Sequence, residues 1–327
     1  MSDEYAPILI DDDDGDIEYD SYIDVDADDI VYFTSDEDSG DGTLRDVLRS
    51  ATSNAVIAPI DDLFYNGEVV IYLTGPLTTN WHGRNIIAGR RGKIRLIGDG
   101  TFAVTGQYGS SYIARGVYED IIFEDFHGTT SIGILGSAAR FSEGWTVNRC
   151  MFLNCDGTLI RNTATTASNA GVLSFVSCLF VNTGDKSYTN RVYCSSPLAT
   201  TKFIGCTASD TVTIGTQGSG SLNMADTLCA QYYLGSLLKK NTYTVEDVCV
   251  NPDNMDFRVK KDNYFSTGAT IEKTGYDFIV IEQNGVFGAI GAVDGNFMTT
   301  VFGDKAEIAL YAMDIATPSG TDVPAFG

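Results

Sequence analysis

The sequence is poor in histidine, tryptophan and proline. Its 327 residues include only 2 His, 2 Trp and 7 Pro. Zinc sites use Cys and His ligands at short, regular spacings, and here the two histidines stand apart and no Cys-x-x-Cys pair occurs. A Ser or Cys nucleophile in a recognisable frame is missing as well. We therefore expect no metal and no cofactor, and nothing favours nucleophilic catalysis.

Long apolar runs and N-terminal positive charge are also missing. No segment approaches the roughly 18 consecutive apolar residues of a membrane-spanning helix, so we expect no membrane span. The first 41 residues hold 17 of the 44 acidic residues and no Lys or Arg, which leaves 44 − 17 = 27 acidic against 21 basic residues elsewhere. This balance disfavours binding to nucleic acid or to an anionic membrane. Without a basic and then apolar start, we expect cytoplasmic synthesis without a signal peptide.

Residues 1–38 are interpreted as an acidic N-terminal arm. We expect the arm to be solvated or docked on a basic surface of a partner. An EF-hand calcium loop is not matched, because Ile10 and Ser21 stand where carboxylates are needed. The run Ile30–Phe33 at the end of the arm is predicted as a strand. The candidate partner-docking residues are Asp11, Asp12, Asp13, Asp14, Asp16 and Glu18.

What the sequence does contain is a short pattern repeated at a fixed interval. Cys150, Cys178 and Cys206 recur within similar segments and are evenly spaced (178 − 150 = 28 and 206 − 178 = 28). A fixed period of this length is typical of stacked repeats, in which each unit buries its surface against its neighbours. The cysteines, seven in all, are best interpreted as buried free thiols. Four polar residues follow the same spacing and are predicted to form a ladder whose side chains bond the turn backbone: Asp125, Asn154, Asn182 and Asp210.

Short strands are predicted from residue 68 onward. The runs Val69–Leu73, Lys93–Ile97 and Ile121–Phe123 are rich in β-branched residues, and Gly or Asp residues follow them closely. Before them, Thr43 is a suitable N-cap for one short helix. Its apolar face consists of Leu44, Val47, Leu48 and Ala51. We expect this helix to cap the open end of the first coil.

The chain resembles the right-handed parallel β-helix proteins of the pectate-lyase-like and polymorphic-outer-membrane-protein-like group. The segment SGDGTLRDVL is similar to the helix that opens many of these solenoids. The segments FRVKKDNYFSTGATI and FGAIGA are similar to their closing coil, although Ala289 or Gly288 replaces the usual Asp. The resemblance covers residues 39–293 and implies an all-β fold with a short N-terminal capping helix. Residues 294–327 are then a C-terminal cap or an oligomerisation segment.

Two kinds of functional site are compatible with this scaffold. A carboxylate pair, with a basic residue for uronates, is what polysaccharide cleavage requires. Solvated surface charge is the stronger interpretation of the residues that could supply it, which are Glu119, Asp120, Glu124 and Arg115. Sugars also stack on aromatic faces, although a structural role is favoured for any single ring. The candidate glycan-binding residues are Trp81, Tyr108, Tyr112 and Trp145.

The fold and the missing export signal together indicate a class of function. A β-helix made in the cytoplasm and built like an extracellular spike suggests a structural or adhesive protein of a bacteriophage particle. We expect a head fibre, a capsid decoration or a tail-spike-like subunit, located in the virion and bound to other virion proteins through its arm. A host-surface glycan is a further candidate ligand. Viral β-helices are commonly homotrimers, so the resemblance implies a trimer. One alternative is a polysaccharide lyase or hydrolase (depolymerase) of the β-helix type, and another is an intracellular or cell-surface bacterial binding protein.

Overall fold

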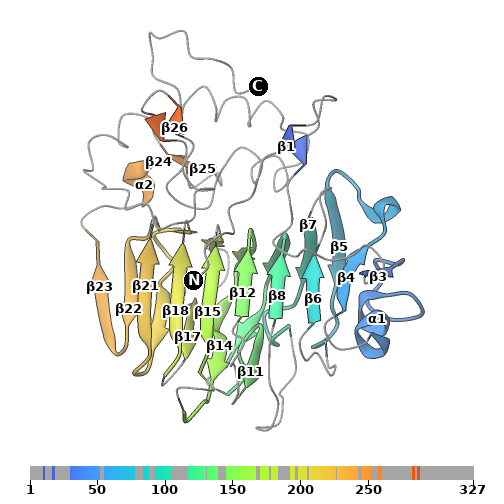
Figure 1. Ribbon diagram of the computed structural model, residues 1–327, viewed down its shortest axis with the longest axis horizontal. Helices are drawn as coiled ribbons and strands as arrows, with labels where there is room; N and C mark the ends of the chain where they lie inside the picture. Colours follow the sequence, from blue (N-terminus) through green and yellow to red (C-terminus); the bar gives the residue numbers. More distant parts are fainter. Residues whose placement is uncertain are drawn as a thin grey trace.

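The computed structural model describes the central part of the chain and short pieces on either side. The described residues are 10–11, 17–18, 30–51, 55–77, 84–87, 93–104, 116–129, 131–138, 145–166, 170–176, 178–182, 192–195, 198–204, 206–225, 227–241, 245–251, 256–259, 282–283 and 286–287. They form a parallel β-helix, in which the chain winds through three sheets and adds one strand to a sheet at each turn (Figure 1). This confirms the predicted fold class.

Three sheets make up the walls of the solenoid. The first runs in the order β21 (Ser221–Ala225), β18 (Thr200–Ile204), β15 (Val172–Val176), β12 (Trp145–Asn148), β8 (Gly116–Glu119), β6 (Arg84–Ile87), β4 (Val56–Pro59) and β3 (Ile30–Phe33). The second runs β19 (Thr207–Ala208), β16 (Leu179–Val181), β13 (Met151–Leu153), β9 (Ile121–Glu124), β7 (Lys93–Ile97) and β5 (Glu68–Tyr72). The third contains β10 (His127–Gly128), β14 (Asp156–Asn162), β17 (Val192–Ser195), β20 (Ile214–Gln217), β22 (Gln231–Leu234) and β23 (Leu237–Lys240), with β11 (Gly136–Ala138) also paired to β14.

The interval between the repeated cysteines corresponds to one turn of the solenoid. Met151 pairs in register with Leu179, and Leu179 pairs with Thr207, so side chains that share a place in the repeat stack on successive turns. Strands in a sheet lie about 4.8 Å apart, which brings like residues into direct contact. The interior is accordingly filled with flat or small apolar groups. Phe152 lies between Phe123 and Phe180, with ring centroids 5.1 and 5.0 Å away and the rings nearly parallel.

Sharp corners join the sheets, and residues in the left-handed region of backbone space make them. Asp120 (φ 57°) and Arg149 (φ 47°) occupy the corner between the first and second sheets. Asp125 (φ 57°) and Asn154 (φ 53°) occupy the next corner. Asp and Asn tolerate this conformation better than other residues with a side chain, so three of these four positions suit their residue type. Arg149 is the exception, and its side chain has a special environment described below.

A short helix closes the N-terminal end. α1 (Leu44–Ser50) begins after Thr43, whose side chain accepts a hydrogen bond from the backbone N–H of Asp46. Leu44, Val47 and Leu48 are buried against the first coil, and α1 lies beside β3 at the end of the solenoid (Figure 1). The capping helix predicted from the sequence is therefore present. β3 falls inside residues 1–38 and is the outermost strand of the first sheet.

The opposite end finishes differently. β22 pairs in parallel with β20, and then the chain reverses so that β23 pairs antiparallel with β22. Three further small elements follow: α2 (Val245–Val248) and the antiparallel pair β24 (Cys249–Asn251) and β25 (Asp256–Val259). Two other two-residue pairs, β1 (Ile10–Asp11) with β2 (Ile17–Glu18) and β26 (Glu282–Gln283) with β27 (Val286–Phe287), are also antiparallel. Residues 294–327 lie outside the described residues. No helix of the described chain is long and apolar enough to span a bilayer.

Candidate functional site

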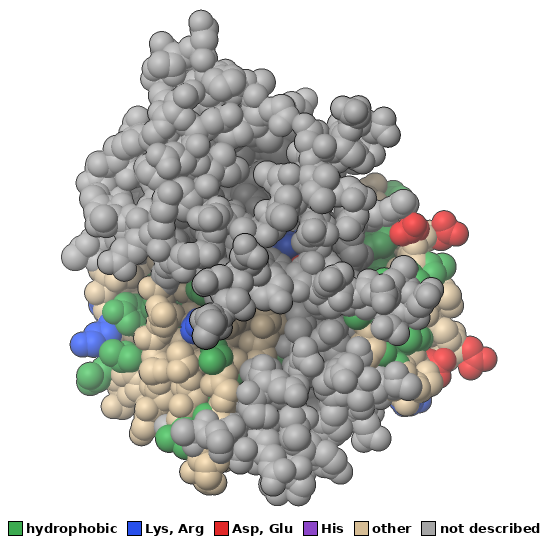
Figure 2. Space-filling model, viewed as in Figure 1, with side chains coloured by type: hydrophobic (Ala, Val, Ile, Leu, Met, Phe, Trp, Pro, Cys, Tyr) green, Lys and Arg blue, Asp and Glu red, His purple; other side chains and the backbone are tan. Residues whose placement is uncertain are grey.

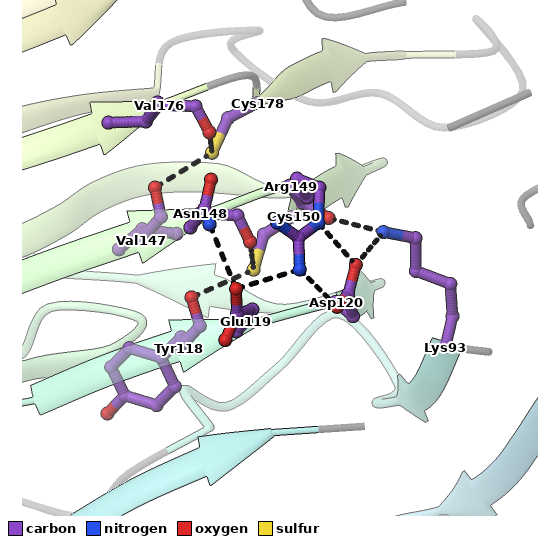
Figure 3. Close-up of polar contacts among 10 residues, drawn as sticks. All are labelled: Lys93, Tyr118, Glu119, Asp120, Val147, Asn148, Arg149, Cys150, Val176 and Cys178. Carbon is purple, nitrogen blue, oxygen red and sulfur yellow. Dashed lines mark hydrogen bonds and ion pairs between the residues drawn. The ribbon is translucent and has the colours of Figure 1, made fainter. Parts of the chain in front are cut away.

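Among the described residues, the densest group of charged side chains lies at the corner between the first two sheets. Lys93, Glu119, Asp120, Asn148 and Arg149 come from three successive turns, and we call them the corner cluster (Figure 3). Lys93 begins β7, Glu119 ends β8 and Asn148 ends β12. The two left-handed corner residues, Asp120 and Arg149, direct their side chains toward each other from adjacent turns. The repeat therefore brings together residues that lie far apart in the sequence.

Within the corner cluster the opposite charges are in direct contact. The Arg149 guanidinium donates to both Asp120 oxygens, at 3.0 and 2.8 Å, and to Glu119 Oε1 at 2.7 Å. Lys93 Nζ lies 2.7 Å from Asp120 Oδ1 and donates to the Arg149 carbonyl at 2.7 Å. Asn148 donates to Glu119 Oε1 at 3.0 Å. Two cations and two carboxylates thus neutralise each other, and this environment explains why an arginine occupies a strained corner position.

The two carboxylates are buried, and their pKa values are shifted in opposite directions. Lys93 and Glu119 are each 1% exposed. Burial raises the pKa of Glu119, and the opposing pull of Arg149 does not compensate. Burial acts on Asp120 in the same sense, but Lys93 and Arg149 outweigh it and hold the pKa of that carboxyl below its usual range. Glu119 Oε2 is buried and has no hydrogen-bond partner among the described residues.

This geometry corrects the expectation that Glu119, Asp120 and Glu124 share an exposed face. Glu119 and Asp120 are buried in the corner cluster, whereas Glu124 lies on the outer face of the second sheet. There Arg95 Nε donates to Glu124 at 2.7 Å, and Arg95 also lies 3.4 Å from Glu68. The corner cluster and the contacts of Arg95 with Glu124 and Glu68 both join neighbouring turns by ion pairs. Carboxylates held in this way are not presented to a substrate as an acid and a base.

Of the candidate glycan-binding aromatic residues, Trp145 lies in the core, and the other three lie outside the described residues. Trp145 is 5% exposed, and its ring stacks on Tyr118 at a centroid distance of 5.5 Å. It fills the interior and offers no face to a sugar, which corrects its assignment as a surface platform. Trp81, Tyr108, Tyr112 and the candidate Arg115 lie outside the described residues, as do Asp12, Asp13, Asp14 and Asp16 of the arm. Asp11 and Glu18 lie in the β1–β2 pair.

The four residues predicted as a polar ladder occupy equivalent positions. The register of β9, β13, β16 and β19 places Asp125, Asn154, Asn182 and Asp210 at the same corner of successive turns. Asp210 bonds a segment that follows the last turn. Its carboxylate accepts hydrogen bonds from the backbone N–H groups of Val245 at 2.6 Å and Glu246 at 2.9 Å, at the start of α2. Asp210 therefore attaches the segment that follows the last turn to the wall of the solenoid.

The repeated cysteines line the interior. All seven are buried and none forms a disulfide. Cys150, Cys178 and Cys206 each donate a hydrogen bond to the backbone carbonyl two residues earlier. Burial is the main cause that raises the pKa of Cys194 and of Cys229 to about 12, well above the usual range of a thiol. Because the thiolate is the reactive form, these cysteines are poor nucleophiles and poor metal ligands in the folded chain.

This burial predicts a simple result with thiol reagents. At pH 8 the folded protein should react with a chromogenic disulfide reagent only as fast as it opens or unfolds, because both access and ionisation are suppressed. All seven thiols should react promptly in guanidinium chloride. The measurement is the number of thiols titrated against time, with and without denaturant. Rapid reaction of several thiols under native conditions would show that the interior is not closed as described.

Sequence reasoning missed the cationic half of the corner cluster. Lys93 was predicted only as the first residue of the strand Lys93–Ile97, and nothing in the sequence around it indicates a buried charge. The spacing in the sequence could have revealed Arg149. Asn148-Arg149 follows Glu119-Asp120 by 29 residues, the same interval that separates Asn154 from Asp125.

Among the described residues no group of His, Cys, Asp or Glu has the arrangement of a metal site. No family model matches the chain, and no curated protein or solved structure is detectably similar to it.

Proposed function

We propose that this protein is a structural component of a bacteriophage particle, such as a head fibre, a capsid decoration or a tail-spike-like subunit. The β-helix serves as a rod, and the acidic N-terminal arm binds a basic surface on a neighbouring virion protein. Arm and rod have different roles in this proposal. The rod sets distance and rigidity, while the arm determines where the protein attaches.

The unequal distribution of charge supports this proposal. In the walls of the solenoid several ionic side chains pair with each other, as in Lys93 with Asp120 and Arg95 with Glu124. The first 41 residues carry 17 acidic residues with no basic residue among them. A segment with that much uncompensated charge is well suited to a basic partner, because complementary charge speeds encounter and selects the partner. Acidic residues without nearby basic residues in the sequence are thus concentrated at the N-terminus.

The construction of the rod is consistent with a mechanical role. Each turn is fixed to the next by in-register strands, stacked rings and ion pairs at the corner. Near the N-terminal end, the Arg45 guanidinium donates to the carbonyls of Gly75 at 3.0 Å and Pro76 at 2.6 Å. This contact ties α1 to the chain that follows β5. Burial would raise the pKa of Asp38, but hydrogen bonds from Thr74 and Arg45 outweigh it and lower that pKa.

Removal of the arm provides the test. Because β3 begins at Ile30, deletion of residues 2–29 should leave the solenoid folded and abolish incorporation into particles. Incorporation is measured by mass spectrometry of particles purified from infections complemented with the variant, and folding by circular dichroism. Replacing Asp11, Asp12, Asp13, Asp14 and Asp16 with Asn and Glu18 with Gln keeps the length of the arm and should lower incorporation in the same direction. Normal incorporation of the deletion variant contradicts the proposal.

The alternative function, a polysaccharide depolymerase, makes a distinct prediction. It requires that purified protein release reducing ends or 4,5-unsaturated products from a capsular or pectin-like glycan. The described carboxylates closest to that role, Glu119 and Asp120, are already bound to Arg149. The structural proposal is therefore preferred.

A further inference from the structure

The two ends of the solenoid carry opposite kinds of surface. At the C-terminal end, β23 is exposed along its whole length, with Leu237 58% and Leu238 46% exposed. Leu234 of the preceding strand is 41% exposed, and Lys239 and Lys240 follow the leucines directly. We call Leu234, Leu237, Leu238, Lys239 and Lys240 the tail surface. It appears as green and blue atoms at the left of the space-filling view (Figure 2).

The N-terminal end is acidic and aromatic. Asp36, Glu37 and Asp41 are exposed on the segment between β3 and α1, and Asp62 is exposed on the short 3-10 helix Asp61–Leu63. Red atoms gather at this end of the molecule, at the right of the view (Figure 2). Three exposed tyrosines accompany them: Tyr32 (50%), Tyr65 (80%) and Tyr72 (68%). Arg49 is an exposed basic residue at the same end. We call Asp36, Glu37, Asp41, Asp62 and these tyrosines the head surface.

β23 also has an open edge. In the described residues it pairs with β22 and with no other strand, so no described strand covers its outer edge. An exposed edge strand that carries leucines is a site for association with another chain. Parallel pairing of two β23 edges would place the lysines of one copy beside those of the other, and antiparallel pairing would place each lysine opposite a leucine, so neither arrangement gives the lysines an oppositely charged partner. An acidic surface provides such a partner.

We propose that the tail surface of one copy binds the head surface of a second copy of this chain. Lys239 and Lys240 would meet Asp36, Glu37, Asp41 and Asp62, and the leucines would pack against the exposed tyrosines. The aromatic faces suit both partners, since they offer apolar area to leucine and attract a lysine ammonium. This inference concerns contacts between copies and does not depend on the virion assignment.

Such an interface is heterologous, because it joins two different surfaces of the same protein. Each pair of copies still has one free head surface and one free tail surface. Further copies can therefore add, and the assembly is an open row or a closed ring of solenoids. A two-fold dimer buries the same surface on both subunits, and a side-by-side trimer leaves both ends of the solenoid out of the contact. The distinction gives the proposal a sharp test.

The test uses two charge-reversal variants of the full chain. K239E/K240E reverses the charge of the tail surface, and D36K/E37K reverses that of the head surface. Neither lysine and neither acidic side chain forms a hydrogen bond or ion pair within the described structure, so both variants should fold, as checked by circular dichroism. Sedimentation velocity should show concentration-dependent association of the wild type. Each variant alone should associate at least about tenfold more weakly, because like charges then face each other.

An equimolar mixture of the two variants decides between the geometries. In a head-to-tail interface the intact tail of D36K/E37K meets the intact head of K239E/K240E, and the reversed pair is complementary too, so association returns. The single variant K240E, with a smaller change in charge, should give an intermediate affinity. The proposal is overturned if the wild type stays monomeric at all concentrations, if either variant associates like the wild type, or if the mixture remains dissociated.

Discussion

Replacement of Phe152 by Ala should lower the free energy of unfolding by about 3 to 5 kcal/mol, the usual range for removing a buried aromatic ring. Phe152 is 1% exposed and lies at the centre of the stack formed with Phe123 and Phe180. Its loss leaves a cavity in contact with three other rings, because Phe175 also packs edge-on against Phe152. A rigid, closed wall gives the neighbouring rings little room to collapse into that space.

Tyr72→Ala is the matched control for this prediction. Tyr72 is also an aromatic residue on a strand of the second sheet, but 68% of it is exposed. Its removal should change the free energy of unfolding by about 0.5 kcal/mol or less, as for most surface substitutions. Both variants are compared by urea denaturation followed by circular dichroism. Equal effects of the two substitutions would mean that the stack contributes no more than an exposed ring.

The repeat made the fold predictable, because its information is distributed over many turns. Cys150, Cys178 and Cys206 recur at one interval, and a solenoid is the architecture in which such an interval places like residues in contact. The capping helix was predictable from Thr43 and its four apolar residues, since local spacing alone determines an amphipathic helix. Neither inference required knowledge of a contact between distant residues.

The site could not be predicted in the same way. Glu119 and Asp120 look like surface charge because strand alternation does not tell which side chain turns inward at a corner. Their environment depends on Lys93, one turn before Asp120, and on Arg149, one turn after it. Trp145 was misplaced for a related reason. A tryptophan next to a predicted turn suits a surface platform equally well, and only its stacking on Tyr118 shows that it belongs to the core.

Replacement of Asp120 by Asn should destabilise the protein by about 3 to 5 kcal/mol, the cost of removing one partner from a buried ion pair. Asn is nearly the same size and tolerates the positive φ of this corner, so the substitution changes the charge with little effect on the backbone. It removes the carboxylate that lies 2.7 Å from the ammonium of Lys93, a side chain 1% exposed. The remaining positive charge then lies in a region that water hardly reaches.

Two further variants identify the cause of this loss. Lys93→Met combined with Asp120→Asn should be more stable than Asp120→Asn alone, because Met fills the same space without a charge. Glu124→Gln, which breaks the more exposed pair with Arg95, should cost about 1 kcal/mol or less. If the double variant is no more stable than the single one, the buried charge is not the reason for the destabilisation.

The pH dependence of the Asp120→Asn effect is a separate check on the same cluster. The pKa of Asp120 is lowered in the folded protein, so its ionised carboxylate stabilises the fold above the ordinary value of 3.8. That stability is lost as the pH falls through the lowered pKa, and the difference between wild type and variant should shrink there. Denaturant titrations at a series of pH values measure this difference. An Asp120→Asn effect that grows as the pH falls below 3.8 would contradict the assignment.

Glu119 provides the contrast within the same cluster, because the shift of its pKa has the opposite sign. Its pKa is raised, so its contribution to stability is present below 4.5 and is lost as the pH rises through the raised pKa. Glu119→Gln removes a carboxylate whose ionisation opposes folding, while Arg149 keeps its contact with Asp120. We therefore expect Glu119→Gln to be less harmful at neutral pH than Asp120→Asn. The same titrations compare the two variants, and an equal loss at neutral pH would show that the two carboxylates do not differ in this way.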